Sequence, residues 1–395
     1  MQGEGKTRAT WLVGLAAVAI IAAACSSGGS SAAPSTAASE AAPSAAAPSE
    51  AAPSEAAPSV AAMYKIAFSN TGGTGNGFRE EQNCTAKAEA LASGMVEKVD
   101  MIARNADTAQ QLADLRTLIA GNPDALVFNP STADGLQAAL DEAQAAGIVT
   151  VAVDAGVSDP ETWKFYNNQV DYAYVGAKWL FEQLGGTGKV WYTRGIAGHP
   201  ADEDRDVGFK KALAEYPDIE VVPNEDGVHT GWDPTTATTL ANEFISSGEY
   251  DKVDGIWTSG MDSQVVDAVK AAGKEYKPIV GADLGAFAAY LLDEANYPGL
   301  VGAAVTNTAS VGGAGVNLAL KLLAGETIEA TDPAVPNTIL LTPVLADNTT
   351  DEGKATLASW QSVEGLNPLW PLSVTIPGWT TYTPEQAVAC KGPGE

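Results

Sequence analysis

The chain has few of the residues that most often bind metals or transfer protons. Its 395 residues include two histidines, His199 and His229, and three cysteines. Neither histidine lies at ligand spacing from a cysteine, so the pattern of a metal site is missing. The G-x-S-x-G and H-E-x-x-H motifs are missing as well. Aspartate and glutamate alone would have to supply any acid–base catalysis, and we expect neither a metal nor a cofactor.

Basic residues are also scarce. The sequence has 22 lysines and arginines against 49 aspartates and glutamates, which gives a formal net charge of −27. A field of this sign repels the phosphate backbone of DNA and RNA. The composition therefore excludes nucleic acid as a partner.

The start of the chain lacks an apolar run long enough to span a membrane. Residues 11–24 are apolar and follow a short basic stretch, but a transmembrane helix needs roughly 20 such residues. The pattern is typical of a secretory signal. Cys25 directly follows three alanines, which resembles the lipobox of bacterial lipoproteins, although that pattern usually has leucine three residues before the cysteine. The resemblance implies a signal peptide over residues 1–24 and an acylated Cys25 on the outer face of the bacterial cell membrane; plain secretion and a spanning anchor are the alternatives.

Residues 25–62 are almost purely alanine, proline, serine and glutamate after the cysteine. A segment without large apolar side chains cannot offset its own conformational entropy, so we expect a disordered tether. Beyond it only Cys84 and Cys390 are left. In an extracytoplasmic compartment such a lone pair is more often bridged than free. We therefore predict a Cys84–Cys390 disulfide that fastens the C-terminal tail to the first helix.

From residue 64 onward, apolar runs alternate with helical patterns. The runs predict strands over 65–68, 96–103, 125–128, 148–153, 189–193, 219–222, 255–258, 278–282 and 300–305. The patterns between them predict helices over 78–92, after 107, across 136–140, and over 203–215, 234–247, 262–272 and 311–323. This alternation is typical of parallel sheets covered by helices on both faces. The number of repeats, and a change of pace near 165–174, favour two doubly wound α/β lobes.

Nearly every predicted strand is followed by a side chain that forms hydrogen bonds. These residues are Ser69-Asn70, Asn105, Asn129, Asp154, Arg194, Ser259, Asp283 and Thr306-Asn307. Ligands of open α/β sheets bind at the carboxyl ends of the strands, so we expect these side chains to converge on one crevice. Turns and helix caps account for some of them.

Several segments resemble the ribose/galactose-type periplasmic binding proteins, which are the substrate-binding subunits of ABC sugar importers. The segments are Lys65–Ser69, Val151–Asp154, Gly195–Gly198 with Arg205 and Gly208-Phe209, and Val280–Asp283. The resemblance covers residues 64–345 and implies the periplasmic binding protein type I fold, with three crossovers near 167–168, 306–308 and 340–342. The implied lobes are 63–168 with 308–340 and 169–307 with 341–350. Residues 351–395, with Trp360, Trp370 and Trp379, form an extension that we expect to be irregular and packed over a lobe.

The resemblance also implies a ligand site. Asn76 and Phe78 stand where the first loop supplies an amide and an aromatic ring, and Asp154 and Asp283 match strand-end carboxylates. Arg205 matches an arginine that donates hydrogen bonds to the sugar. Charged groups suit the hydroxyls of a polyol, and a ring covers its C–H face.

Further residues complete the predicted site. Arg79 replaces a second ring and brings a positive charge, whereas Thr306 or Asn307 replaces a glutamine, so the sugar need not be ribose. Strand-end Asn70 and loop residue Asp262 belong to the same predicted set. Other candidates for shaping the crevice are His199, Trp232, Trp257 and Met261.

The function predicted from the sequence is capture of a monosaccharide or polyol by a monomeric receptor that delivers it to an ABC permease. A sensory receptor for a membrane kinase would have the same fold. A carbohydrate-acting enzyme is the third hypothesis, and it would use Asp154 and Asp283 as its pair of carboxylates.

Overall fold

The structure is a computed structural model that describes residues 63–72, 75–332, 334–360 and 363–395. The predicted signal peptide, Cys25 and the tether up to residue 62 lie outside these residues. Within the described part of the chain, no helix combines the length and the apolar character needed to cross a membrane.

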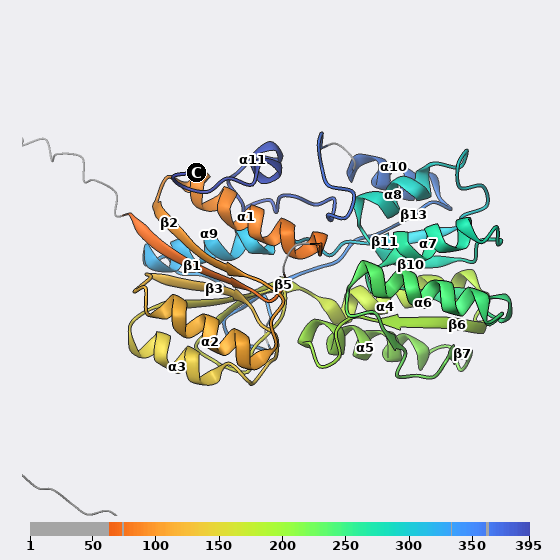
Figure 1. The fold of residues 1–395 in the computed structure, drawn as a ribbon, viewed down its shortest axis with the longest axis horizontal. Coiled ribbons are helices and arrows are strands. Elements are labelled where there is room, and N and C mark those ends of the chain that lie inside the picture. Colours follow the sequence, from red (N-terminus) through yellow and green to blue (C-terminus); the bar gives the residue numbers. More distant parts are fainter. Residues whose placement is uncertain (1–62, 73–74, 333, 361–362) are drawn as a thin grey trace, which may run out of the picture. The chain divides into compact units, whose positions relative to one another are not determined.

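The N-terminal lobe is built on a six-stranded parallel sheet (Figure 1). Its strands, in spatial order, are β12 (Thr338–Leu341), β5 (Trp163–Asn167), β4 (Val149–Val153), β3 (Ala125–Asn129), β1 (Tyr64–Asn70) and β2 (Val96–Ala103). Helices α1 (Gly77–Ser93) and α9 (Val311–Leu323) cover one face, and α2 (Thr108–Ile119) and α3 (Gln137–Ala145) cover the other. Phe68 on β1 packs toward the first pair and its neighbour Ala67 toward the second, so both faces of this strand are buried.

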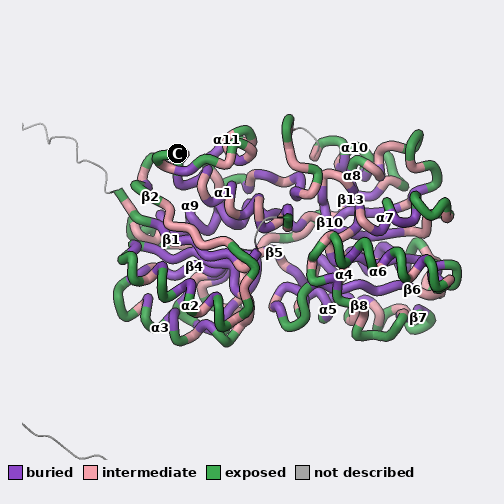
Figure 2. Tube along the Cα trace, viewed as in Figure 1, coloured by how far each residue is buried: buried purple, intermediate pink, exposed green. Residues whose placement is uncertain are grey.

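The C-terminal lobe is built on a seven-stranded sheet. Six strands follow the order β13 (Leu345–Asp347), β11 (Gly302–Val305), β10 (Ile279–Ala282), β9 (Gly255–Trp257), β6 (Thr187–Arg194) and β7 (Asp218–Val222), and β8 (Val228–His229) pairs with β6. Only β13 is antiparallel to its neighbour in this described sheet. The helices of this lobe are α4 (Gln169–Gln183), α5 (Pro200–Leu213), α6 (Pro234–Ser246), the 3-10 turn Tyr250–Lys252, α7 (Asp262–Ala271) and α8 (Gly285–Leu292). Figure 2 shows buried strands between helices whose outer faces are exposed.

The predicted fold is confirmed, and the chain passes between the lobes at the three expected places. It leaves the first sheet after β5, returns between β11 and α9, and crosses again between β12 and β13. At the first crossing, Asn168 caps α4 by accepting a hydrogen bond from the Asp171 amide at 3.0 Å. Asn167 Nδ2 donates to the Thr308 carbonyl at 3.1 Å, which ties the first crossing to the second.

The expectation of an irregular segment is confirmed for the described residues 363–383, which contain no helix or strand, but the expected packing over a single lobe is wrong. The extension contains α10 (Asp351–Trp360) and α11 (Pro384–Ala389), and it contacts both lobes. Helix α10 packs on the C-terminal lobe against α8 and β13, whereas α11 packs on α1 of the N-terminal lobe. Between them the Ser373 carbonyl accepts a hydrogen bond from Ser310 Oγ at 2.8 Å. The extension therefore crosses between the lobes a fourth time, which local sequence patterns did not indicate.

The predicted Cys84–Cys390 disulfide is present and joins residues 306 positions apart. Cys84 lies in α1 and Cys390 directly after α11, so the bridge fastens the tail to the first helix as expected. A Thr383 capping box starts α11. Nearby, Glu89 of α1 accepts hydrogen bonds from the amide and the hydroxyl of Thr381 at 2.7 and 2.9 Å.

Two carboxyl groups from different lobes are fully buried near this crossing. Glu81 lies on α1 and Asp283 follows β10, and both are 0% exposed. Asp283 Oδ1 accepts from the Asn307 amide at 2.9 Å, while Asp283 Oδ2 and both oxygens of Glu81 have no hydrogen-bond partner among the described residues. Burial raises the pKa of Glu81 well above its ordinary value and that of Asp283 to about 7, and repulsion from Asp283 adds to the shift of Glu81. Both groups are thus most stable when protonated.

Replacing Asp283 with asparagine should remove one pH-dependent contribution to stability. Asp283 ionises near its ordinary pKa of 3.8 in the unfolded chain but only near 7 in the folded protein. The stability that it contributes is therefore complete below about pH 4 and is lost as the pH rises toward 7. The stability of Asp283→Asn relative to the unmodified protein should rise by about 1.4 kcal/mol per pH unit across this window. Urea unfolding at several pH values, with the exposed Asp226→Asn as a control, measures this difference; a constant difference would contradict the prediction.

Candidate functional site: a pocket between the lobes

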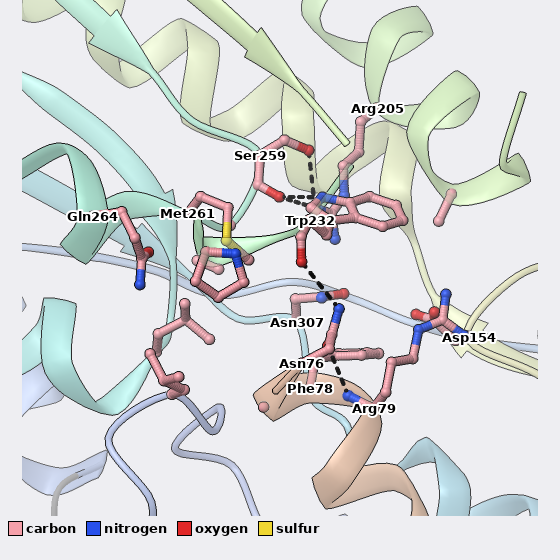
Figure 3. A pocket seen from close by; sticks show the side chains of 17 residues that line it. Asn76, Phe78, Arg79, Asp154, Arg205, Trp232, Ser259, Met261, Gln264 and Asn307 are labelled. Atoms are coloured by element: carbon pink, nitrogen blue, oxygen red, sulfur yellow. Dashed lines mark hydrogen bonds between the residues drawn. The ribbon is translucent and has the colours of Figure 1, made fainter. Parts of the chain in front are cut away.

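Both lobes contribute to one pocket at the carboxyl ends of their strands (Figure 3). The space free of protein atoms between these residues is about 610 Å³, a volume that includes the part open to solvent. The lining residues are Asn76, Gly77, Phe78, Arg79 and Asp154 from the N-terminal lobe, Ala201, Arg205, Trp232, Pro234, Ser259, Gly260, Met261, Gln264, Ala282, Leu284 and Asn307 from the C-terminal lobe and its boundary, and Leu369 from the extension. Six of the nine predicted ligand residues are among them.

The start of α1 supplies three of the lining side chains. Asn76 caps the helix by accepting a hydrogen bond from the Arg79 amide at 3.0 Å, which fixes Phe78 and Arg79 on the first turn. The Arg79 side chain is buried, and one terminal nitrogen donates to Asn70 Oδ1 at 3.0 Å. Burial lowers the Arg79 pKa, and the Asp154 carboxylate counteracts this shift.

Asp154 follows β4 in a left-handed backbone conformation with φ of 70°. Few residues other than glycine adopt this region, and such strain is concentrated at functional sites. One carboxylate oxygen accepts a hydrogen bond from Asn129 Nδ2 at 2.9 Å. Burial raises the Asp154 pKa, whereas the charges of Arg79 and Arg205 and the hydrogen bond from Asn129 lower it.

Arg205 projects from α5 into the same space and is held on several sides. Its guanidinium lies 4.3 Å from the centre of the Tyr172 ring and 5.4 Å from that of Trp232. Its Nε donates to Gln169 Oε1 at 2.8 Å, and one terminal nitrogen donates to the Ser259 carbonyl at 2.8 Å. These contacts leave the other terminal nitrogen for a ligand.

Two polar contacts cross the pocket from lobe to lobe. Asn76 Nδ2 donates to the Trp232 carbonyl at 3.2 Å, and a terminal nitrogen of Arg79 lies 3.0 Å from His199 Nε2. His199 is buried and caps α5. Burial and the nearby arginines lower its pKa well below the ordinary value, so the ring is neutral at physiological pH. The site therefore contains two arginines and one aspartate as its charged lining groups.

Three predicted ligand residues, Asn70, Asp262 and Asp283, do not line the pocket. Asn70 lies behind Arg79 and supports it. Asp262 accepts hydrogen bonds from the Thr258 hydroxyl and, at 3.1 Å, from the Ala282 amide, and its pKa is raised to about 6 by burial. Asp154 and Asp283 consequently do not face a common space, which argues against the pair that the enzyme hypothesis requires.

Of the four residues expected to shape the crevice, Trp232 and Met261 line the pocket. His199 contacts Arg79 from the other lobe but does not line the pocket, and Trp257 belongs to the core of the C-terminal lobe. The sequence analysis missed Gln264, Leu284 and Leu369. Gln264 lies on the first turn of α7 and Leu284 follows a strand end, so both could have been found. For Leu369 no signal existed, because its position depends on the path of the extension.

No group of histidine, cysteine and acidic residues in the described part of the chain could hold a metal ion.

Comparison with known proteins gives a consistent result. Residues 66–327 match the family described as periplasmic binding protein domain. A xylitol-binding protein of Mycolicibacterium smegmatis is 30% identical over 184 residues, which are 45% of this chain and 51% of that protein. A ribose import binding protein of Bacillus subtilis is 23% identical over 196 residues, which are 49% of this chain and 62% of that protein. The chain thus matches between half and two thirds of the length of these two relatives.

The fold agrees with solved structures as well. An ABC transporter solute-binding protein from Thermobispora bispora superimposes with a TM-score of 0.66 at 27% identity, covering 78% of this chain and 89% of that one. The family match extends over more than half of the chain and includes strands and helices of both lobes. The chain therefore belongs to the periplasmic binding protein family.

Proposed function

We propose that the protein is an extracytoplasmic receptor that captures a monosaccharide or related polyol between its lobes and delivers it to an ABC permease. The observation that carries this proposal is the convergence of Asp154, Arg79 and Arg205 from two lobes on one buried pocket. The xylitol- and ribose-binding relatives support a polyol as the ligand class. Closure of the lobes on the ligand would be the signal that the permease reads.

The pocket has spare hydrogen-bonding capacity of the kind that hydroxyl groups need. One oxygen of Asp154 and one terminal nitrogen of Arg205 extend beyond their protein partners. Arg79 also has a donor to spare. A neutral imidazole has a single acceptor nitrogen, and in His199 this is Nδ1, which accepts from the Ala201 amide. The nitrogen that Arg79 faces, Nε2, then carries a hydrogen and cannot accept from Arg79. A hydroxyl both donates and accepts, so one polyol can satisfy the carboxylate and the arginines together.

A binding role without catalysis fits this geometry better than an enzyme. A glycosidase needs two carboxyl groups on opposite sides of the scissile bond, and Asp154 is the single carboxylate among the described lining residues. The ligand would leave the pocket unchanged. We expect the receptor to act as a monomer, because its two lobes complete the site within one chain.

Sugar binding can be tested by thermal unfolding of the full chain with a panel of pentoses, hexoses and inositols. A ligand at about 100 times its Kd should stabilise the protein by about 2.7 kcal/mol and raise the unfolding temperature by several degrees. Stabilisation by one or a few members of the panel is the expected result. If none of them shifts the transition in protein shown by mass spectrometry to be free of co-purified sugar, the polyol receptor is wrong.

Asp154→Asn should weaken binding of the stabilising sugar by about 10- to 100-fold, because a hydrogen bond to a charged group contributes about 1.5–3 kcal/mol. Asp159→Asn is the matched control, since Asp159 is an equally buried aspartate of the same lobe outside the pocket. Calorimetric titration of both variants measures the effect. Equal affinities of Asp154→Asn and the control would show that the sugar binds elsewhere.

The membrane anchor is a separate part of the proposal and rests on the sequence pattern around Cys25. Acyl chains on this cysteine would hold the receptor on the outer face of the cell membrane, with residues 25–62 as the spacer. Expression of Cys25→Ser in a bacterial host should move the protein from the membrane fraction to the medium or periplasm. A Cys25→Ser protein that stays in the membrane fraction as fully as the unmodified one would contradict lipid anchoring through this residue.

A further inference from the structure

We propose that the pocket selects a polyol carrying an apolar substituent, such as a deoxy methyl or an O-alkyl group, and that Leu369 of the extension helps to select it. This inference rests on the proposed function and specifies its ligand class. It follows from how polar and apolar groups are distributed along the pocket.

Met261 lies at the end of the pocket opposite the charged pair Asp154 and Arg79 (Figure 3). Figure 3 shows Asp154 and Arg79 at one end and Met261 and Gln264 at the other. The side chains of Arg79, Asp154 and Arg205 are nearly inaccessible to solvent, at 3–4% exposure. The apolar residues Met261 and Leu369 are partly exposed at the pocket.

Four large apolar side chains of the pocket belong to none of the hydrophobic clusters formed by the described residues. They are Phe78, Trp232, Met261 and Leu369. Each is partly exposed, so its apolar surface is not satisfied by the protein itself. Convergence of such surface on one pocket stabilises a bound apolar group. Phe78 and Trp232 could pack against the C–H face of any sugar. Met261 and Leu369 add aliphatic surface that such a ring contact does not require.

Polar groups near the apolar side chains are largely committed to protein partners. Trp232 Nε1 donates to the Ser259 carbonyl at 2.7 Å, and Asn76 Nδ2 donates to the Trp232 carbonyl at 3.2 Å. Gln264 accepts from the Ser263 hydroxyl at 3.2 Å and keeps its amide nitrogen, which can donate to an ether oxygen. Gln264 Oε1 keeps one acceptor site, so a hydroxyl group placed here has few partners to replace its water, whereas an alkyl group loses no hydrogen bond.

Leu369 is held in place by the segment around it. The Gly285 amide donates to the Trp370 carbonyl at 2.9 Å, and the Ala286 amide donates to the Pro368 carbonyl at 2.7 Å. These bonds join the extension to the first turn of α8. Leu369 is therefore a fixed part of the wall on the C-terminal lobe.

The same residue also contacts the N-terminal lobe. A Cβ atom on Gly77 would lie 2.2 Å from the Leu369 carbonyl oxygen, so the close approach requires glycine at the start of α1. The extension thus reaches the pocket at the point where the lobes meet. A residue in this position can discriminate between ligands without touching the charged end.

Matched pairs of ligands test the inference. The pairs are D-galactose with D-fucose, L-mannose with L-rhamnose, and myo-inositol with its mono-O-methyl ethers, and calorimetry measures their affinities for the full chain. Burial of the methyl group added in an O-methyl ether gives about a fourfold gain. In the deoxy sugars the gain comes instead from removing a hydroxyl that would lose its hydrogen bond to water. In the pair that binds best, the apolar member should bind at least fourfold more tightly than its parent.

Leu369→Asn should reduce this preference to less than twofold and leave the affinity for the parent polyol within about threefold. Met261→Gln is a second variant of a partly exposed apolar lining residue and should have the same effect. Leu91→Asn, at a 42% exposed leucine on α1 outside the pocket, is the matched control and should keep the full preference. Thermal unfolding without ligand verifies that the variants are folded.

The outcomes separate the inference from the proposed function. If parent polyols bind as tightly as their apolar counterparts in every pair, the inference is wrong and the polyol receptor stands. If the preference persists in both Leu369→Asn and Met261→Gln, the assigned selectivity residues are wrong. If no member of any pair binds, the proposed function fails and the inference fails with it.

Discussion

Burial of three charged side chains at the junction of two lobes is the constraint on which the rest of the site depends. Arg79, Asp154 and Arg205 are removed from water, and a buried charge is tolerated only with an opposite charge and hydrogen bonds around it. The charges of Arg79 and Arg205 both act on the Asp154 carboxylate. Arg205 also contacts the Tyr172 ring and donates a hydrogen bond to the Ser259 carbonyl. The two polar contacts across the pocket complete this environment only when the lobes are together. The buried charges and the contact between the lobes are therefore parts of one electrostatic arrangement.

The extension adds a second constraint, because it connects the lobes away from the three crossovers of the core fold. It is fixed to the C-terminal lobe around Trp370 and to α1 by the Cys84–Cys390 disulfide. A rotation of the lobes that opens the pocket must therefore also move this connection. The extension also places Leu369 in the pocket wall, so a segment outside the matched family region contributes to the lining of the pocket.

Local sequence patterns predicted the architecture well, because alternating apolar runs and caps such as Asn76 and Asp107 determine where strands end and helices begin. They also indicated which polar residues lie at strand ends. They could not indicate whether such a side chain faces the pocket, as Asp154 does, or turns into the wall, as Asp283 does, because that depends on packing between distant elements. The path of the extension is missing from the sequence analysis for the same reason, since contacts such as that between Gly77 and Leu369 join residues far apart in the chain.

A crystal structure of the full chain grown with its best-binding polyol would test the central claim most directly. The account predicts ligand density between Asp154 and Arg205, with hydroxyl groups at the charged end and the apolar part of the ligand against Met261 and Leu369. It also predicts that the hydrogen bond between Asn76 and the Trp232 carbonyl is retained. Ligand density outside this pocket, or a ligand with its apolar group against Asp154, would contradict the account.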